Sequence, residues 1–220
     1  KIANLAKQRI RNAIHTVANN FSADMYGDGS LANQIGGLQV LVSDTGTGTV
    51  GGIDSSAFPF WQNKVQSAAA PMQGGGAIIP SAVAGIMESL MLPLYMATTR
   101  NNDKVDLIVS SDDYFAFYEQ GLSSQKQYLD SESAEAGFMA LRYKSAKIIY
   151  DGNSGMPSAH MYFLNTKHIE VVAHQDANLT VVGDEGEGLR PINQDAAVVP
   201  ILWMGNMTCS NRSLQGVLKA

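Results

Sequence analysis

The stretch Val105-Asp106-Leu107-Ile108-Val109-Ser110-Ser111-Asp112-Asp113 is the clearest indication of the fold, because it joins two kinds of secondary structure. Its apolar first half, which ends at Ser110, predicts a strand. Ser111, Asp112 and Asp113 are residue types that cap helix N-termini, and the aromatic residues after them predict a helix. The unit is therefore a strand, a cap and a helix.

Segments of strand type dominate the chain after this unit, whereas helical patterns dominate before it. The predicted strands cover residues 143–150, 161–164, 169–172, 179–182 and 198–204. Upstream, a helix is predicted to begin at Pro80-Ser81, and Pro93 should kink or end it. Long helices early in the chain and strands late predict an α+β fold.

The N-terminal segment has apolar residues at steps of three and four, which predicts an amphipathic helix of about six turns. These residues are Leu5, Ala6, Ile10, Ala13, Ile14, Val17, Ala18 and Phe21. The helix should end near Asn19 or Asn20, because residues 26–30 are rich in glycine and aspartate and are typical of a turn.

The segment between the two helices is rich in glycine and aromatic residues. Residues 45–54 predict an ordered loop, and the aromatic residues around Pro59 predict an irregular segment that is fixed by buried rings. The run Gly74-Gly75-Gly76 has no side chains that pack, so it predicts a hinge or boundary between two lobes.

Composition excludes several classes of protein. The chain has 220 residues, a net charge of -5, 45% hydrophobic and 16% charged residues, so disorder is excluded. The most apolar stretch, 78–97, is interrupted by polar residues and Pro93, so no membrane span is predicted.

A single cysteine, Cys209, predicts a reducing compartment. Mild acidity and scattered basic residues argue against a protein that coats DNA. A helical pattern that starts at Lys1 suggests a piece of a longer protein.

The sharpest enzymatic motif is Val42-Ser43-Asp44-Thr45-Gly46. Asp-Thr-Gly after an apolar strand is typical of aspartic proteases, in which two carboxylates share one proton. Thr47-Gly48-Thr49 departs from the residues expected next, and the chain is more helical than such a barrel. An aspartic-type hydrolase centred on Asp44 is kept as the alternative from the enzyme class.

Other candidate sites have simpler structural explanations. Residues 46–52 lack the Lys-Ser/Thr pair of a phosphate-binding loop, and Asp184-Glu185-Gly186-Glu187 lacks the spacing of a calcium loop. Residues 110–113 are explained by their role as a helix cap, and no base stands near Cys209 in the sequence.

The histidines do not define a metal site. They are His15, His160, His168 and His174. His168 and His174 flank a strand and could share one of its faces, but no third ligand is specified. We therefore assign no catalytic, cofactor-binding or metal-binding residue.

Three ordered motifs resemble the major capsid proteins of tailed double-stranded-DNA bacteriophages. The first is Ile35-Gly36-Gly37-Leu38 with Gly48-Thr49-Val50-Gly51-Gly52-Ile53-Asp54 and Phe60-Trp61-Gln62-Asn63. The second is residues 105–110 with Tyr114 and Tyr118, and the third is residues 203–212 with Leu214-Gln215-Gly216-Val217. The sequence departs from the family in lacking its N-terminal arm and extended loop, and Gln62 stands where relatives often carry Arg.

The resemblance implies the Hong Kong phage-type capsid fold. Residues 1–76 would form a peripheral domain with a long spine helix and strands, and residues 77–172 an axial domain with a mixed sheet and flanking helices. Residues 173–220 would return as strands to the peripheral domain, with an axial loop near 184–198.

The resemblance also implies a structural role without enzymatic activity. The chain would self-assemble as pentamers and hexamers into an icosahedral shell around double-stranded DNA, in the virion of a tailed phage or prophage, after assembly in the bacterial host cytoplasm. Further partners would be scaffold, decoration or portal proteins, with no membrane and no cofactor. An encapsulin-like protein compartment is the third alternative.

Overall fold

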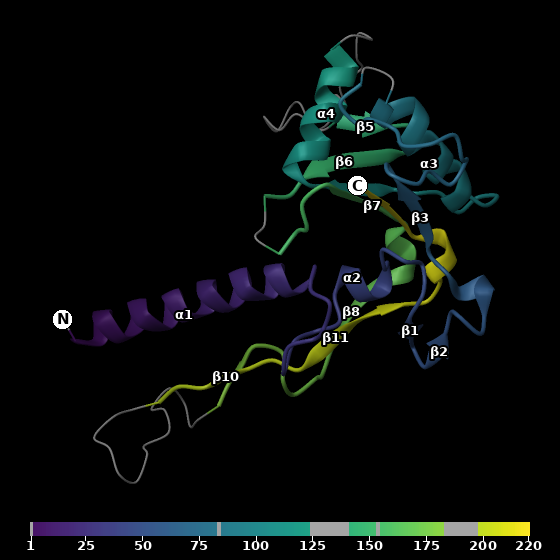
Figure 1. Cartoon of the computed structure of the whole chain (residues 1–220). Coiled ribbons are helices and arrows are strands. Elements are labelled where there is room, and N and C mark those ends of the chain that lie inside the picture. The colour runs from purple at the N-terminus through teal and green to yellow at the C-terminus, as the bar shows by residue number, and fades with distance from the viewer. Residues whose placement is uncertain (1, 83–84, 124–140, 153–154, 183–197) are drawn as a thin grey trace.

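A six-stranded mixed sheet forms the centre of the computed structural model, which describes residues 2–82, 85–123, 141–152, 155–182 and 198–220 (Figure 1). In spatial order its strands are β3 (Lys64–Ser67), β12 (Gly216–Lys219), β7 (His160–Leu164), β4 (Leu107–Ser110), β6 (Ala146–Tyr150) and β5 (Leu141–Tyr143). The pairs β3–β12 and β4–β6 are parallel, and the other neighbours are antiparallel. The predicted α+β class with a mixed sheet is thereby confirmed.

Both faces of this sheet are buried, which explains the continuous apolar run around Ile108. Successive side chains of a strand point to opposite faces. Ile108, Phe163 and Leu218 contribute to one hydrophobic cluster, whereas their neighbours Val109 and Tyr162 contribute to another. A strand covered on both sides reads as uninterrupted apolar sequence rather than as alternation.

Helices cover the first face. They are the π-helix η2 (Gly85–Met91), α3 (Leu92–Thr98) and α4 (Asp112–Ser123). Pro93 was predicted to kink or end a helix; instead it lies in the first turn of α3, where proline needs no hydrogen-bond partner. The helix changes type there, from π to α, without ending. Ser111 precedes α4 as predicted, but its hydroxyl accepts from the backbone N–H of His160 at 3.2 Å.

The second face is covered by residues that follow α1 (Ile2–Asp24), together with the short helix α2 (Leu38–Leu41). Tyr26, Leu38 and Leu41 are buried here. Gly37 allows the chain to pass closely, since a Cβ at this position would lie 2.5 Å from the carbonyl oxygen of Met25.

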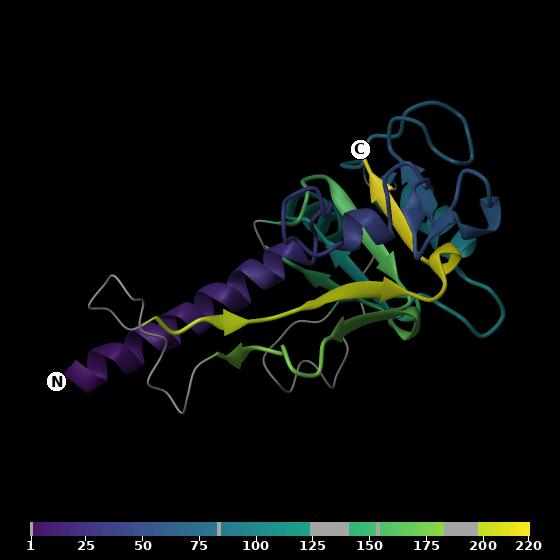
Figure 2. The same ribbon diagram turned by 90° about the horizontal axis from the view of Figure 1, so that it is seen from below.

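Helix α1 is longer than predicted. It continues to Asp24, past the end expected near Asn19 or Asn20. Phe21 packs edge-on against Trp203 with ring centroids 4.7 Å apart, and this tertiary contact holds the last turn in helical form. At about 1.5 Å per residue the helix is roughly 35 Å long, and it projects from the body (Figures 1 and 2).

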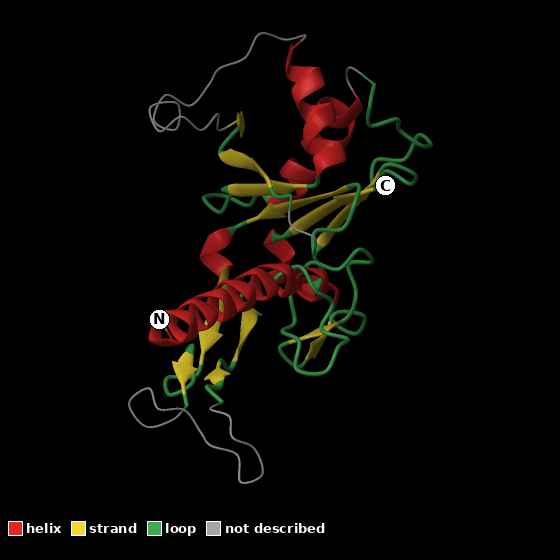
Figure 3. Cartoon of the chain, turned by 90° about the vertical axis from the view of Figure 1, so that its left-hand side faces the viewer, coloured by secondary structure: helices red, strands yellow, loops and turns green. Residues whose placement is uncertain are grey.

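A β-arm leaves the body on the same side as α1 (Figure 2). It consists of two antiparallel pairs: β8 (Ile169–Ala173) with β11 (Gly205–Cys209), and β9 (Thr180–Val181) with β10 (Ile201–Leu202). The hairpin of β1 (Thr49–Val50) and β2 (Ile53–Asp54) lies on the other side, and Figure 3 shows it apart from the arm. The short helices η1 (Pro59–Trp61), η3 (Thr166–His168) and η4 (Arg212–Leu214) connect these parts.

Two strands of the central sheet, β3 and β12, were not predicted. The predicted segments 143–150, 161–164 and 169–172 do contain strands, and 179–182 and 198–204 contain short ones. The sheet combines strands from before residue 76, from 77–172 and from after 173. None of the described helices is long and apolar enough to cross a membrane.

Candidate assembly surfaces

A buried arginine organises the glycine-rich segment 40–55. Arg212 is fully buried, and its guanidinium donates to four backbone carbonyls and two hydroxyls. The acceptors and their distances are Leu41 O 2.7 Å, Thr47 O 3.0 Å, Ser43 Oγ 3.0 Å, Gly48 O 3.2 Å, Ser55 Oγ 3.2 Å and Val40 O 3.4 Å. All six acceptors are uncharged, and burial lowers the pKa of Arg212.

The hydrogen bonds of Arg212 also show whether residues 46–52 could bind a phosphate. A phosphate-binding loop turns its backbone N–H groups toward an anion. Here the carbonyls of Thr47 and Gly48 face a cation, which is the opposite polarity. The loop is therefore ordered by the chain's own arginine, in agreement with the predicted ordered loop.

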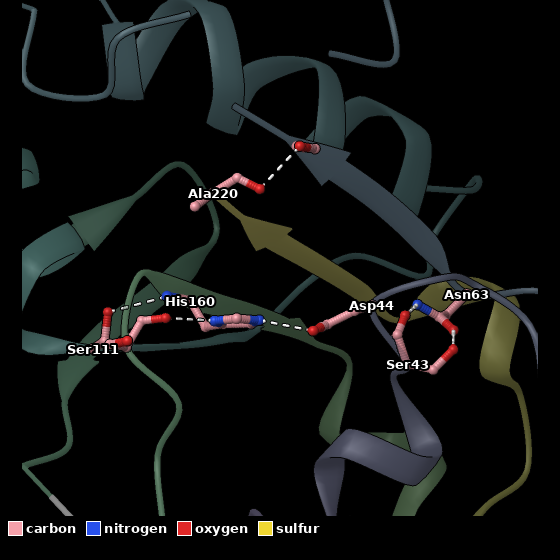
Figure 4. Close-up of polar contacts among 8 residues, drawn as sticks. Ser43, Asp44, Asn63, Ser111, His160 and Ala220 are labelled. Carbon is pink, nitrogen blue, oxygen red and sulfur yellow. Dashed lines mark hydrogen bonds and ion pairs between the residues drawn. The ribbon is translucent and has the colours of Figure 1, made fainter. Parts of the chain in front are cut away.

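Asp44 pairs with a histidine rather than with a second carboxylate (Figure 4). Its Oδ2 lies 3.0 Å from Nε2 of His160, and Nδ1 of His160 lies 2.7 Å from the carbonyl oxygen of Ser158. Burial, with the charge of Asp44 as a second cause, raises the pKa of Tyr162. An aspartic protease needs two carboxylates that share a proton, and among the described residues of this chain the partner of Asp44 is His160.

The geometry around His160 also differs from that of a serine hydrolase. Ser111 Oγ accepts from the backbone N–H of His160 and not from a ring nitrogen (Figure 4). Both ring nitrogens already face other acceptors, so neither is free to take a proton from a serine. The contact between His160 and Asp44 therefore joins β7 to the segment that follows α2.

The remaining sequence candidates are dispersed. An extended strand rises about 3.3 Å per residue, so His168 and His174 are roughly 20 Å apart and cannot share a metal ion. His15 is exposed on α1. Burial raises the pKa of the Cys209 thiol, which disfavours the reactive thiolate. Among the described residues, no three His, Cys, Asp or Glu side chains could hold a metal ion. Residues 184–187 lie outside the described residues.

An apolar groove separates α1 from the β-arm. Its volume is about 600 Å³, and its walls carry Val17 and Phe21 from the helix and Val171, Leu179 and Trp203 from the arm. The apolar positions Ile10 and Ile14 farther along α1 are 37% and 45% exposed. An amphipathic helix with an uncovered apolar face is typical of an interface.

Two aromatic rings project from the opposite side of the molecule. The prediction that the rings around Pro59 are buried is wrong for Phe58 and Phe60, which are 51% and 68% exposed. Trp61 is half-buried, and its Nε1 donates to the carbonyl of Val50 at 3.1 Å. The hydrogen bond of Trp61 anchors η1 to β1, while the two phenylalanines lie on the surface. The sequence signal for exposure would have been the surrounding serines and alanine, residues 55–57, which supply little area to cover the rings.

Comparison with known proteins gives a likeness to solved structures. No family model and no curated protein sequence matches the chain. Among solved structures, a chain of the cyanophage A-1(L) capsid asymmetric unit superimposes with a TM-score of 0.59 at 16% sequence identity. The alignment covers 97% of this chain and 68% of the cyanophage chain. The protein therefore has a phage capsid fold.

Proposed function

We propose that this chain is a structural capsid protein of a tailed phage or prophage and acts by self-assembly. The observation that carries the proposal is that 97% of this chain superimposes on a cyanophage capsid chain. In the Hong Kong phage-type arrangement, α1 would be the spine helix of a peripheral domain over residues 1–76. Residues 77–172 would be the axial domain, and residues 173–220 would return to the periphery.

The exposed apolar surfaces support this proposal. A shell subunit needs surfaces that contact several copies of itself, whereas it needs no catalytic site. The chain exposes apolar residues on α1, on the arm and on η1, three separate places on the molecule. Pentamers and hexamers of the chain would form an icosahedral shell that encloses double-stranded DNA without sequence-specific contacts, and that DNA would be confined by the shell and not held by charge.

The test is assembly of the purified chain, followed by light scattering and negative-stain electron microscopy. Rings or shells support a capsid function, whereas a stable monomer at all concentrations contradicts it. The contents of shells purified from cells are then digested separately with nuclease and protease. Double-stranded DNA inside supports a genome container, whereas a protein cargo would assign the chain to an encapsulin-like compartment.

Glycine loops would accommodate the different environments of pentamers and hexamers. Gly74, Gly75 and Gly76 all have positive φ, and a Cβ on any of them would meet open space. In the segment 45–52, Arg212 holds the first part, so the adjustable part is the tip at Gly51-Gly52. Replacement of residues 74–76 by alanine should alter the distribution of shell sizes. An unchanged distribution would contradict this role.

A further inference from the structure

The N-terminal third of the chain is divided into a basic and an acidic part. Residues 1–23 contain four basic residues and no acidic one: Lys1, Lys7, Arg9 and Arg11. Residues 24–63 contain four acidic residues and no Lys or Arg: Asp24, Asp28, Asp44 and Asp54. The prediction of scattered basic residues is therefore wrong for this part of the chain, and Lys7, Arg9 and Arg11 are all exposed on α1.

The last two turns of α1, including Asp24, form one wall of the groove between α1 and the β-arm, and the basic residues lie farther toward the start of the helix. Val17 and Phe21 belong to α1, while Leu179 and Trp203 form the facing wall. Leu179 is 51% exposed although its environment is apolar. A cavity of about 150 Å³ holds one benzene ring, so the groove of about 600 Å³ has room for two phenyl rings.

The acidic part carries the two exposed rings at η1, which we call the aromatic knob, residues Phe58 and Phe60. Their centroids are 6.0 Å apart in an edge-on arrangement. After the knob, Trp61 is hydrogen-bonded to β1 and Gln62 Nε2 donates to the carbonyl of Ser55 at 3.0 Å. At its start, the backbone N–H of Phe58 donates to the carbonyl of Asp54 at 3.0 Å, so both ends of the knob are held. A knob that is ordered before it binds loses little conformational entropy on association.

We propose that the aromatic knob of one copy docks in the α1–arm groove of a second copy. The knob lies beside the β1–β2 hairpin, on the side of the body away from α1 and the arm, so it faces away from its own groove (Figure 1). Asp54, whose carbonyl oxygen accepts from the backbone N–H of Phe58 at 3.0 Å, is exposed beside the knob, and its charge is opposite to that of the exposed Lys7, Arg9 and Arg11 of α1. This charge difference favours a second copy as the partner and orients it. Buried aromatic anchors in an apolar pocket are the usual dominant contacts of an interface.

This contact is heterologous, because a knob meets a groove and not another knob. A head-to-tail contact of this kind closes into a ring when the rotation between copies permits, as a pentamer or hexamer requires. The inference rests on the proposed capsid function and adds to it the residues that join neighbouring copies.

The test uses two surface variants of the full chain. The knob variant carries Phe58→Asp and Phe60→Asp, and the groove variant carries Val17→Asp and Leu179→Asp. Met96→Asp is the matched control, because Met96 is 66% exposed and belongs to neither surface. Circular dichroism establishes folding of each protein. Phe58→Ala with Phe60→Ala, which adds no charge, serves as a second knob variant.

Sedimentation velocity should show assemblies for wild type and for Met96→Asp, and monomers for each surface variant, with at least a tenfold loss in association constant. An equimolar mixture of the knob and groove variants should form a heterodimer that grows no further, because only one intact knob–groove pair remains. Variants that assemble like wild type, or that fail to pair when mixed, overturn the inference and leave the proposed function intact. A monomeric wild type overturns both.

Discussion

Replacement of Arg212 should destabilise the whole protein, because its buried guanidinium donates to six buried or partly buried acceptors. A methionine would fill a similar volume but would leave the carbonyls of Val40 and Leu41 without this donor. An unsatisfied buried polar group costs about 1–3 kcal/mol, so even two unsatisfied carbonyls give a loss of about 2–6 kcal/mol. Removal of the buried charge offsets part of that loss. We expect Arg212→Met to lower the free energy of unfolding by about 3–5 kcal/mol.

Arg212→Lys separates geometry from charge. The ammonium keeps the positive charge but has three donors in place of the five of a planar guanidinium. The ammonium cannot reach carbonyls on both sides of the segment 40–48. We therefore expect Arg212→Lys to lower the free energy of unfolding by about 2–4 kcal/mol. The matched control is Arg100→Lys, since Arg100 is exposed and its guanidinium donates to Ser213 Oγ at 3.1 Å, while its other hydrogen bonds, to Asp103, come from the backbone and would be kept. The control should change stability by no more than about 0.5 kcal/mol.

The measurement is urea unfolding followed by tryptophan fluorescence, with the midpoint and the slope recorded for each variant. Both tryptophans, Trp61 and Trp203, lie outside the residues changed. A urea midpoint for Arg212→Lys equal to that of wild type would refute the reasoning. A positive charge alone would then provide the stability that we attribute to six directed hydrogen bonds.

Three further predictions concern pH, close packing and the Asp44 pair. Burial raises the pKa of Tyr114 to about 12, above its ordinary value of 10.0, so the native state keeps its full stability below about pH 10 and loses it as the pH rises toward 12. Part of the phenolate absorbance, including that of Tyr114, should therefore appear only together with unfolding, and ionisation of all eight tyrosines near pH 10 in the folded protein would contradict this. Gly37→Ala should cost about 1–3 kcal/mol in thermal unfolding, because the new Cβ meets backbone at 2.5 Å. Gly36→Ala, whose nearest contact is 3.6 Å, is the control and should be nearly neutral. Asp44→Asn should lower stability by about 1 kcal/mol, since the pair with His160 is partly exposed, and should leave assembly unchanged; a lost peptide-cleavage activity would revive the hydrolase alternative.

The layered core was predictable because it depends on local pattern. The apolar run through Ile108, followed by residues that cap a helix, predicts strand and helix without knowledge of their neighbours. Most strand-type segments later in the chain contain strands for the same reason. In each case the periodicity or apolar content of a short segment carries enough information.

The two missed strands depend on distant partners. β3 has the sequence Lys64-Val65-Gln66-Ser67, with no apolar run, and it becomes a strand by parallel pairing with β12 at the other end of the chain. Its buried Gln66 is satisfied by groups far from it in sequence, including the carbonyl of Ser89 at 3.3 Å. Contacts between residues that are so far apart in the sequence cannot be predicted from a local pattern.

The candidate surfaces were hidden for a similar reason. Aromatic residues around a proline usually pack inward, whereas here the hydrogen bonds of Trp61 and Gln62 to Val50 and Ser55 fix the segment and Phe58 and Phe60 are exposed. The role of Arg212 was equally invisible, because its acceptors are mainly backbone carbonyls about 160 residues away, and any sequence supplies carbonyls.

The aromatic knob and Arg212 are connected through hydrogen bonds of Ser55. Its hydroxyl accepts from Arg212, and its carbonyl accepts from Gln62, which immediately follows η1. Arg212 belongs to η4, which leads directly into β12 of the central sheet. The aromatic knob is therefore held against the core by a short chain of hydrogen bonds, although its own rings are exposed. Loss of that chain would release the knob at a lower free energy than the unfolding of the sheet. An Arg212 variant that retains the folded sheet should consequently assemble poorly, because a mobile knob must be ordered at each contact around a ring.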